Sequence, residues 1–326
     1  MNKVLLEHFK IKHNKIRYLI KRKKIFGAIK GKVKIRKKVT NKSIMSNTLK
    51  LLLFKEKPII VYWWTGDGGN NWGDALNPIL IQNLSGRKPI LSEEIINLKN
   101  QDVYSVIGSV LGIVNDKSLV IWGSGFISSS SRFKIKPRRI CAVRGPLTRE
   151  LIVNQGIDCP KVYGDPALLY PLFYKPNVKK KYRLGIIPHF VDKNNQLMGM
   201  FKNSTEILII NILCKTNELI DNICKCERIA SSSLHGIIAA DAYGVPSIWV
   251  EFSENVRGDG FKFYDYFESV GRKNEKPFRI TEDTTVQEIF NEYKNYKIDI
   301  DLGKLLEVCP FLTRTEINNL KKRLNN

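Results

Sequence analysis

Hydrophobic and polar positions follow two alternating patterns from about residue 58 onwards. Short apolar runs are typical of buried strands, and they alternate with segments whose apolar residues recur every three or four positions, as on one face of a helix. The run Pro58–Trp64 predicts the first strand. Apolar spacing over 74–84 predicts the first helix, with Asp74 as its N-cap. Further strands are expected at 104–110, 119–122, 140–143 and 162–163, and a helix at 146–154.

A polar, basic segment containing Pro176 separates this series from a second one. The second series predicts strands at 182–188, 206–210, 228–230 and 246–250, and helices at 218–225, 234–243, 261–270, 286–293 and 316–324. Strands alternating with helices indicate α/β layers with parallel sheets. We therefore predict two doubly wound α/β domains, with boundaries 56–175 for the first and 176–326, terminal helices included, for the second.

The positive charge is concentrated at the start of the chain. The net charge is +23, and residues 1–50 carry 17 Lys/Arg against one acid, Glu7. We expect a basic arm over residues 1–55, amphipathic or disordered. An arm of this kind binds an anionic membrane surface or remains a solvated tail. Because it has few aromatic residues and no RNA-binding or zinc-finger motif follows it, we expect no nucleic-acid partner.

The composition is that of a globular protein, with 43% apolar and 26% charged residues among 326. Its six cysteines include no CxxC pair, so we expect reduced thiols, no structural zinc and a cytoplasmic location. No apolar run approaches the roughly 18 residues that span a bilayer. These features exclude a collagen, a disulfide miniprotein, a transmembrane bundle and a wholly disordered chain.

Polar or glycine-rich turns directly follow several of the expected strands. They are Asn71-Trp72-Gly73-Asp74, Gly123-Ser124-Gly125, Arg144-Gly145, His189 and Ser231–Gly236. Ligands of doubly wound sheets bind beyond the carboxyl ends of the strands, where helix N-termini favour anions. The pattern therefore predicts an anionic small molecule in the cleft between the two domains.

Three of these side chains suit chemistry on an anion. Arg144, just before a helix start, is expected to hold a phosphate or carboxylate; the alternative is a surface arginine paired locally. His235 follows a serine run at a helix start and suits anion binding or proton transfer; the alternative is a core or capping histidine. His189 has the same placement and the same two interpretations. Dinucleotide, P-loop, zinc-protease and serine-hydrolase motifs are absent, and Asp299-Ile-Asp301 is interpreted as a solvated loop rather than a metal site.

The sequence resembles the polysaccharide pyruvyl transferase family, especially its bacterial exopolysaccharide (succinoglycan-type) branch. The resemblance covers about residues 58–270 and leaves the arm and the last 50 residues outside. The segments that carry it are Trp63-Trp64, Asn71–Pro78, Trp122–Gly125, Ala142–Thr148, Gly164–Leu169, Ile187–Asp192, Ser233–Gly236, Ala240–Pro246 and Phe261–Asp265.

The resemblance implies two Rossmann-like domains in a GT-B-like arrangement. It implies transfer of pyruvate from phosphoenolpyruvate to two hydroxyls of a sugar, which forms a ketal and releases phosphate, with no cofactor and no obligatory metal. Acceptors in this branch are glycans on polyprenyl diphosphates at the inner membrane face. We therefore expect a lipid-linked oligosaccharide as partner and a peripheral membrane association through the arm.

The resemblance also implies roles for particular residues. It makes His235 the catalytic acid/base, Arg144, His189, Ser233, Lys262, Gly123 and Ser124 donor-binding residues, and Asn71, Gly73 and Asp74 acceptor-binding residues. Several relatives have Arg-Leu-His where this chain has Ser233-Leu234-His235, and Lys262 is the expected replacement for that arginine. Two alternatives remain: a GT-B glycosyltransferase using a nucleotide sugar, and a non-catalytic glycan-assembly protein.

Overall fold

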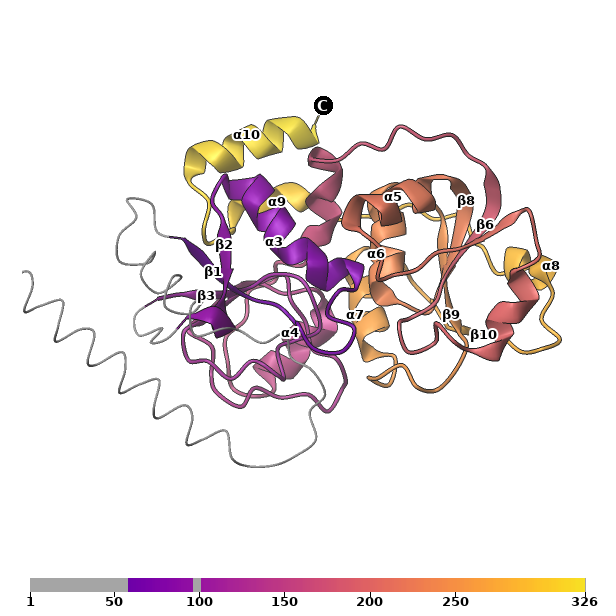
Figure 1. Cartoon of the computed structure of the whole chain (residues 1–326). Helices are drawn as coiled ribbons and strands as arrows, with labels where there is room; N and C mark the ends of the chain where they lie inside the picture. Colours follow the sequence, from indigo (N-terminus) through magenta and orange to yellow (C-terminus); the bar gives the residue numbers. More distant parts are fainter. Residues whose placement is uncertain (1–57, 96–100, 326) are drawn as a thin grey trace, which may run out of the picture.

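Two five-stranded parallel sheets lie side by side in the computed structural model, which describes residues 58–95 and 101–325 (Figure 1). The predicted α/β class is confirmed, and the two sheets are consistent with two Rossmann-like domains. The expected basic arm lies outside the described residues, and the domain boundaries and the GT-B-like arrangement stay predictions.

The first sheet has the strand order β2-β1-β3-β4-β5. Its strands are β1 (Ile59–Tyr62), β2 (Pro89–Leu91), β3 (Val103–Ser105), β4 (Leu119–Trp122) and β5 (Arg139–Ala142). The elements that accompany them are α3 (Trp72–Ser85), η1 (Ser92–Glu94), α4 (Pro146–Val153) and η2 (Pro166–Leu172). The chain reverses its direction of travel across this sheet between β1 and β3, which makes their carboxyl ends a switch point.

The second sheet repeats the same topology, in the order β10-β9-β8-β6-β7. Its strands are β6 (Tyr182–Ile187), β7 (Ile207–Ile209), β8 (Cys226–Ser231), β9 (Ser247–Glu251) and β10 (Phe278–Arg279). The accompanying helices are η3 (Gln196–Phe201), α5 (Thr216–Cys224), α6 (Leu234–Ala242), α7 (Phe261–Ser269) and α8 (Val286–Asn291). Its switch point lies between β6 and β8.

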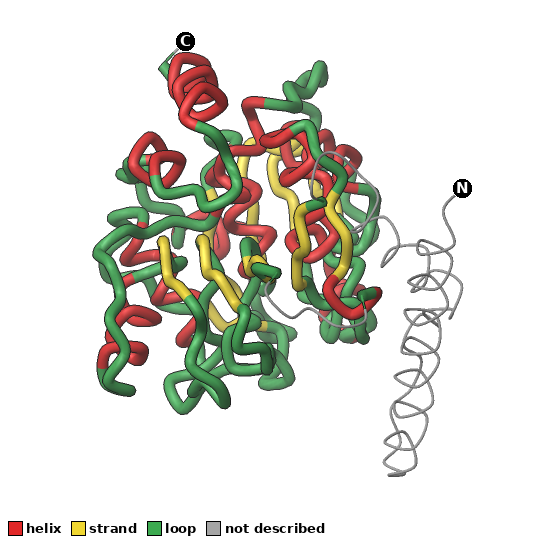
Figure 2. Tube along the Cα trace, turned by 90° about the vertical axis from the view of Figure 1, so that its left-hand side faces the viewer, coloured by secondary structure: helices red, strands yellow, loops and turns green. Residues whose placement is uncertain are grey.

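The last two helices, α9 (Leu302–Glu307) and α10 (Arg314–Leu324), follow the second sheet in the chain but pack on the first half (Figures 1 and 2). The Trp122 indole N–H of β4 donates to the carbonyl of Leu305 at 2.9 Å. The Phe311 ring packs edge to face on Trp122 and on Tyr104. The C-terminal segment therefore closes the core of the first half.

Helices α3, α6 and α7 lie between the two sheets (Figure 1). Their buried residues Leu76, Ile237 and Phe263 belong to one apolar cluster that is continuous across both halves. Burial of apolar surface stabilises the folded state by about 25 cal/mol per Å², so separating the two halves at this cluster would cost free energy. The shared core therefore fixes the loops of the two halves against each other.

Three local predictions are wrong. The strand expected over 104–110 ends at Ser105, since residues 106–110 form no strand. Asn71, not Asp74, is the N-cap of α3, since its side chain accepts the N–H groups of Gly73 and Asp74. Asp74 lies inside the first turn. Residues 162–163 form no strand, because only a single bridge joins Val143 to Tyr163.

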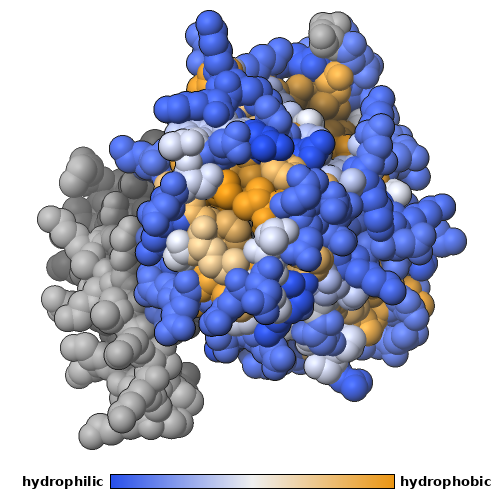
Figure 3. Space-filling view, turned by 90° about the vertical axis from the view of Figure 1, so that its right-hand side faces the viewer, coloured by the Kyte–Doolittle hydropathy of each residue, from blue (hydrophilic) through white to orange (hydrophobic). Residues whose placement is uncertain are grey.

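The surface of the second half carries an apolar patch framed by hydrophilic residues (Figure 3).

None of the described helices combines the length and the apolar character needed to cross a membrane.

Candidate active site

The two switch points face each other, and side chains from both meet there. Asn71 belongs to the loop after β1, and His235 to the first turn of α6 after β8. The Asn71 side-chain oxygen lies 2.8 Å from His235 Nδ1. Next to this contact the Trp72 N–H donates to the Ile212 carbonyl at 3.0 Å. These predicted residues therefore come together at the boundary between the two halves.

Asn71 is the centre of a small hydrogen-bond network. Its Oδ1 accepts the backbone N–H groups of Gly73 at 3.2 Å and Asp74 at 3.4 Å. Its Nδ2 donates to the Gly68 carbonyl at 2.9 Å and to the Asp74 carboxylate. Helix capping and the contact to His235 thus use the same amide.

Gly73 leaves room for the His235 ring. A Cβ built on Gly73 would lie 2.2 Å from His235 Nε2, far inside van der Waals contact. The backbone of α3 therefore meets the imidazole directly, and a larger residue at position 73 would displace it.

The position of His189 is fixed by a hydrogen bond from its backbone N–H group. Its N–H donates to Ser232 Oγ at 2.8 Å, and that hydroxyl donates to Asp192 at 2.9 Å. The Val191 N–H donates to His189 Nδ1 at 3.4 Å. Sequence reasoning missed Ser232, although it lies in the serine run that drew attention to the site.

Both histidines are neutral at neutral pH. Burial lowers the pKa of His235 to about 3, with the charges of Lys262 and Arg144 adding to the effect. Burial, Lys262 and His235 lower the pKa of His189 to about 3. A bound anion would offset the neighbouring cations and raise both pKa values.

Lys262 is the least compensated charge in this group. It lies in the first turn of α7 and is 6% exposed. Within the described part of the chain no carboxylate pairs with it. Burial and the charge of Arg144 lower the pKa of Lys262 to about 8, so it still carries its proton at neutral pH. A buried cation without an acid is costly, which indicates a place for an anionic ligand.

Arg144 is buried and already engaged. Its Nε donates to Asp265 at 2.9 Å. Its terminal nitrogens donate to Ser109 Oγ at 2.6 Å and to the Phe126 carbonyl at 2.7 Å. Arg144 contributes positive charge to the group around Lys262 and His235, while direct contact with a donor stays a prediction.

Asp265 of α7 is a second residue that sequence reasoning gave no role. It accepts the N–H and the hydroxyl of Thr148, each at 2.7 Å, in addition to Arg144. A Cβ on Gly145 would lie 1.8 Å from the Asp265 carbonyl, so α4 and α7 touch through a glycine. The signal was present, since Asp265 ends the segment Phe261–Asp265.

The remaining predicted donor residues fall into two groups. Ser124 is buried and accepts from Ser105 Oγ at 2.8 Å, and Gly123 adopts φ +101° against Pro166. Both support the end of β4.

Ser233 is the N-cap residue of α6 but makes no side-chain capping bond, and no partner for the N–H groups of Leu234 and His235 occurs among the described residues. The start of α6 therefore offers free donors to an anion.

Asp74 has an unusual protonation state for a carboxyl group. It is 5% exposed. Burial raises the pKa of Asp74 to about 7, against the opposing hydrogen bonds from Asn71 and the Trp64 backbone. A carboxyl group that titrates near neutral pH suits proton exchange with a sugar hydroxyl.

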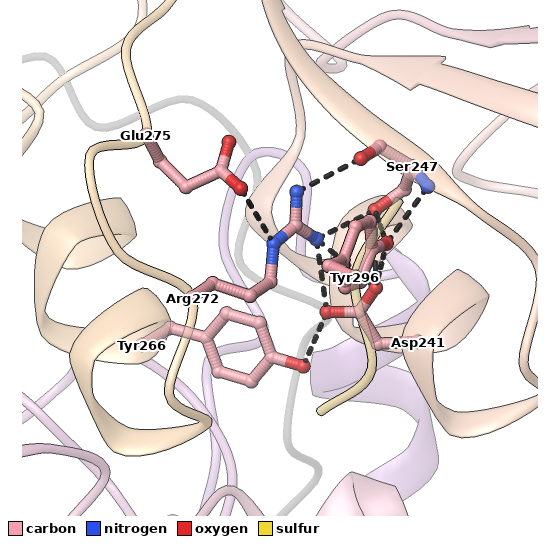
Figure 4. A network of polar contacts seen from close by, with 6 residues as sticks. All are labelled: Asp241, Ser247, Tyr266, Arg272, Glu275 and Tyr296. Atoms are coloured by element: carbon pink, nitrogen blue, oxygen red, sulfur yellow. Dashed lines mark hydrogen bonds and ion pairs between the residues drawn. The ribbon is translucent and has the colours of Figure 1, made fainter. Parts of the chain in front are cut away.

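A buried polar network supports the helices that carry these residues (Figure 4). Arg272, just after α7, donates to both carboxylate oxygens of Asp241 on α6 at 3.1 Å. Tyr266 and Tyr296 donate to the same carboxylate at 2.9 and 2.6 Å. The network ties the C-terminal ends of α6 and α7 together, so their N-terminal ends keep His235 and Lys262 in place.

No cluster of three or more His, Cys, Asp or Glu suited to a metal ion occurs within residues 58–95 and 101–325. A separate pocket of about 260 Å³ lies in the second half and contains none of the predicted site residues. It is lined by Arg183, Leu184, Ser204, Glu206, Ile207, Val286, Gln287 and Phe290.

A protein family model and two known proteins match this chain. The family model described as polysaccharide pyruvyl transferase matches residues 9–254. The chain is 30% identical over 277 residues to the uncharacterized protein L143 of Acanthamoeba polyphaga mimivirus, covering 82% of this chain and 93% of that protein. It is 28% identical over 216 residues to the succinoglycan biosynthesis protein ExoV of Rhizobium meliloti (strain 1021), covering 64% of each chain.

The matched range corrects the extent expected for the resemblance. It begins at residue 9, inside the predicted arm, and ends at residue 254, before Lys262. Most of residues 1–55 therefore lies within the matched range instead of outside it, whereas the α7 segment lies beyond it. With three quarters of its length matched by one family model, the chain belongs to the polysaccharide pyruvyl transferase family.

Proposed function

We propose that the protein transfers pyruvate from phosphoenolpyruvate to two hydroxyls of a sugar residue in a cell-surface polysaccharide or its lipid-linked precursor. The single observation that carries the proposal is Lys262, a buried ammonium without an acidic partner among the described residues, next to two histidines and Arg144. A donor with both a phosphate and a carboxylate supplies the missing negative charge.

The donor phosphate would lie at the start of α6. The free N–H groups of Leu234 and His235 point to that end, and Ser233 adds a hydroxyl without a capping bond. Lys262 replaces the arginine that relatives carry at the position of Ser233. Backbone donors, a helix N-terminus and one cation together form a typical phosphate site.

His235 would carry the proton in the reaction. His235 takes the proton of the first sugar hydroxyl as that oxygen attacks the substituted carbon of phosphoenolpyruvate, and it gives the proton to the neighbouring methylene carbon, which becomes a methyl group. The bond from that carbon to the phosphate oxygen then breaks. The second hydroxyl closes the ketal, and its proton leaves with the phosphate. Of the two hydroxyl protons, one thus ends on carbon and one on phosphate.

The acceptor would approach from the α3 side. Asp74, whose pKa burial raises to about 7, exchanges a proton with a sugar hydroxyl, and Gly73 leaves space for the His235 ring beside it. Asn71, predicted to hold the acceptor, is occupied by His235, Asp74 and the helix start. We therefore assign acceptor binding mainly to Asp74.

Titration calorimetry with phosphoenolpyruvate and with nucleotide sugars tests the donor. Phosphoenolpyruvate is expected to bind, and binding of a nucleotide sugar instead would favour the GT-B glycosyltransferase alternative. Incubation with phosphoenolpyruvate and lipid-linked oligosaccharides should release phosphate and increase the product mass by pyruvate less water. Glycan binding without phosphate release, unaffected by His235→Ala, would favour the non-catalytic assembly protein.

A lipid-linked acceptor also gives the basic N-terminal segment a use. Each cation near an anionic bilayer contributes about 1 kcal/mol of attraction, and residues 1–50 carry 17 Lys/Arg. We propose a cytoplasmic protein, with a GT-B-like domain arrangement, that associates peripherally with the membrane. Deleting residues 1–45 should weaken binding to anionic liposomes and spare turnover of a soluble acceptor. Because the family match begins at residue 9, equal loss of both would assign these residues to the fold instead.

A further inference from the structure

The orientation of the Asn71 amide is fixed by three backbone contacts of known direction, and the Asp74 carboxyl group lies beside them. Two backbone N–H groups, from Gly73 and Asp74, point at Oδ1. Two acceptors, the Gly68 carbonyl and the Asp74 carboxylate, face Nδ2. Reversing the amide would set donor against donor at both N–H groups and acceptor against acceptor at the Gly68 carbonyl. Asn71 therefore presents an oxygen, which cannot donate, to His235.

This orientation decides where His235 carries its proton. An oxygen acceptor 2.8 Å from Nδ1 requires a hydrogen on Nδ1. In the neutral ring Nε2 then has no hydrogen and exposes its lone pair. No hydrogen-bond partner of Nε2 occurs among the described residues. Nε2 is thus the atom of His235 that is available to a ligand.

His189 has the opposite arrangement. Its Nδ1 faces a backbone donor, the N–H of Val191 at 3.4 Å, so this nitrogen accepts and the neutral ring carries its hydrogen on Nε2. The turn that sets this geometry is fixed by the bond from the His189 N–H to Ser232. His189 therefore offers a donor where His235 offers an acceptor.

We propose that the cleft holds its two histidines in opposite tautomers, so that His235 accepts and returns a proton through Nε2 while His189 donates a hydrogen bond to the bound anion. Asn71 is the positioning residue that sets the state of His235. The division of roles rests on the proposed function, whereas the tautomers themselves are properties of the free protein.

Long-range ¹H–¹⁵N spectra of protein labelled at histidine nitrogen measure these tautomers without substrate. The four histidines are distinguished by His189→Gln and His235→Gln. At neutral pH His235 should show a protonated Nδ1 and an unprotonated Nε2, and His189 the reverse. A His235 protonated at Nε2, or a His189 protonated at Nδ1, overturns the proposal.

Two variants test the role of Asn71. Asn71→Ser keeps a helix-capping side chain but is too short to reach the imidazole, so His235 should become a mixture of tautomers. Asn71→Asp keeps an oxygen that caps and accepts from Nδ1–H, so it should restore the Nδ1-protonated form. Because its second oxygen faces the Gly68 carbonyl and the Asp74 carboxyl, it should also lower the unfolding midpoint. An unchanged His235 spectrum in Asn71→Ser overturns the assignment.

Thr313→Ala is the matched control, because it removes the N-cap of α10, a helix that contains none of the site residues. It should lower the unfolding midpoint and leave both histidine spectra unchanged. In Asn71→Ser the turnover number should fall at least tenfold with the donor dissociation constant nearly unchanged. If the histidine spectra are as expected but the protein does not bind phosphoenolpyruvate, the proposed donor is refuted. The assignment of the tautomers would still stand.

Discussion

The two ends of helix α7 carry buried cations with opposite surroundings. Arg272, just past its C-terminal end, is 4% exposed and bonds to Asp241, Glu275 and Ser247, with its guanidinium stacked over Phe267 and Tyr296 (Figure 4). Lys262, in the first turn, is 6% exposed and has no such acid within the described residues. The cation at the C-terminal end therefore has acidic partners within the protein, whereas the cation at the N-terminal end has none among the described residues.

This difference separates a structural charge from a functional one. Where the fold itself needs a buried cation, it surrounds that cation with acids and carbonyl groups, because an uncompensated buried charge costs several kcal/mol. Where the cation serves a ligand, the compensating charge arrives with the ligand.

Replacement of the proton carrier should give the largest effect. His235→Gln should lower the turnover number by about 10²–10⁴-fold, the usual contribution of acid–base catalysis. Phosphate release assays measure the rate, and calorimetry measures donor affinity, which should change little. Turnover within twofold of the unchanged protein would refute the role of His235.

Replacing Arg272 should mainly lower the free energy of unfolding. Arg272→Met leaves Asp241 buried without its partner and should cost about 3–5 kcal/mol of unfolding free energy. Urea unfolding measures this. The control is Arg183→Met, which removes an exposed ion pair with Glu206 and should cost at most about 1 kcal/mol. Equal effects of the two variants would contradict the structural reading of Arg272.

Replacing Lys262 should lower donor affinity and leave the stability of the fold intact, the reverse of what is expected at Arg272. Lys262→Met should leave stability unchanged or raised, since it removes a buried charge without an acid. Donor affinity should fall about 10- to 100-fold, as expected for a lost charged hydrogen bond. Calorimetry measures it, with Lys321→Met, at an exposed ion pair, as the control. A large loss of stability with unchanged donor affinity would make Lys262 structural.

The smallest effect should be a pH dependence set by Asp74. Its pKa is about 3.8 in the unfolded chain and about 7 in the folded protein, because burial disfavours the charge. Below the unfolded value both states hold the proton; as pH rises through this window, the unfolded state loses it first and folding stability falls. Asp74→Asn should therefore gain stability relative to the unchanged protein as pH rises from about 4 to 7, and level off above.

Urea unfolding of both proteins at several pH values checks this difference. The two histidines act in the opposite direction: burial lowers their pKa values, so their contribution to stability is lost as pH falls below the unfolded value of 6.5. Comparing Asp74→Asn with the unchanged protein cancels that contribution. A pH-independent difference would show that Asp74 stays ionised.

Local pattern was sufficient for most of the secondary structure. Apolar runs predicted β1, β4 and the β6–β9 series, and helical spacing predicted α3, α4, α6 and α7. It failed at 162–163, where two residues pair only through one bridge, and at the start of α3, where the cap is three residues earlier than expected. Short strands and helix ends depend on partners outside the local window.

The α/β class, the family and the residues at the strand ends could be inferred from the amino-acid sequence alone, because periodicity and residue type are local properties. The folded arrangement was needed to show that Asn71 contacts His235, that Asp265 pairs with Arg144, and that Lys262 has no acidic partner within the described residues. Both contacts, Asn71 with His235 and Asp265 with Arg144, join segments more than a hundred residues apart. Hydrogen bonding and charge compensation across such distances exist only after the two halves have packed together.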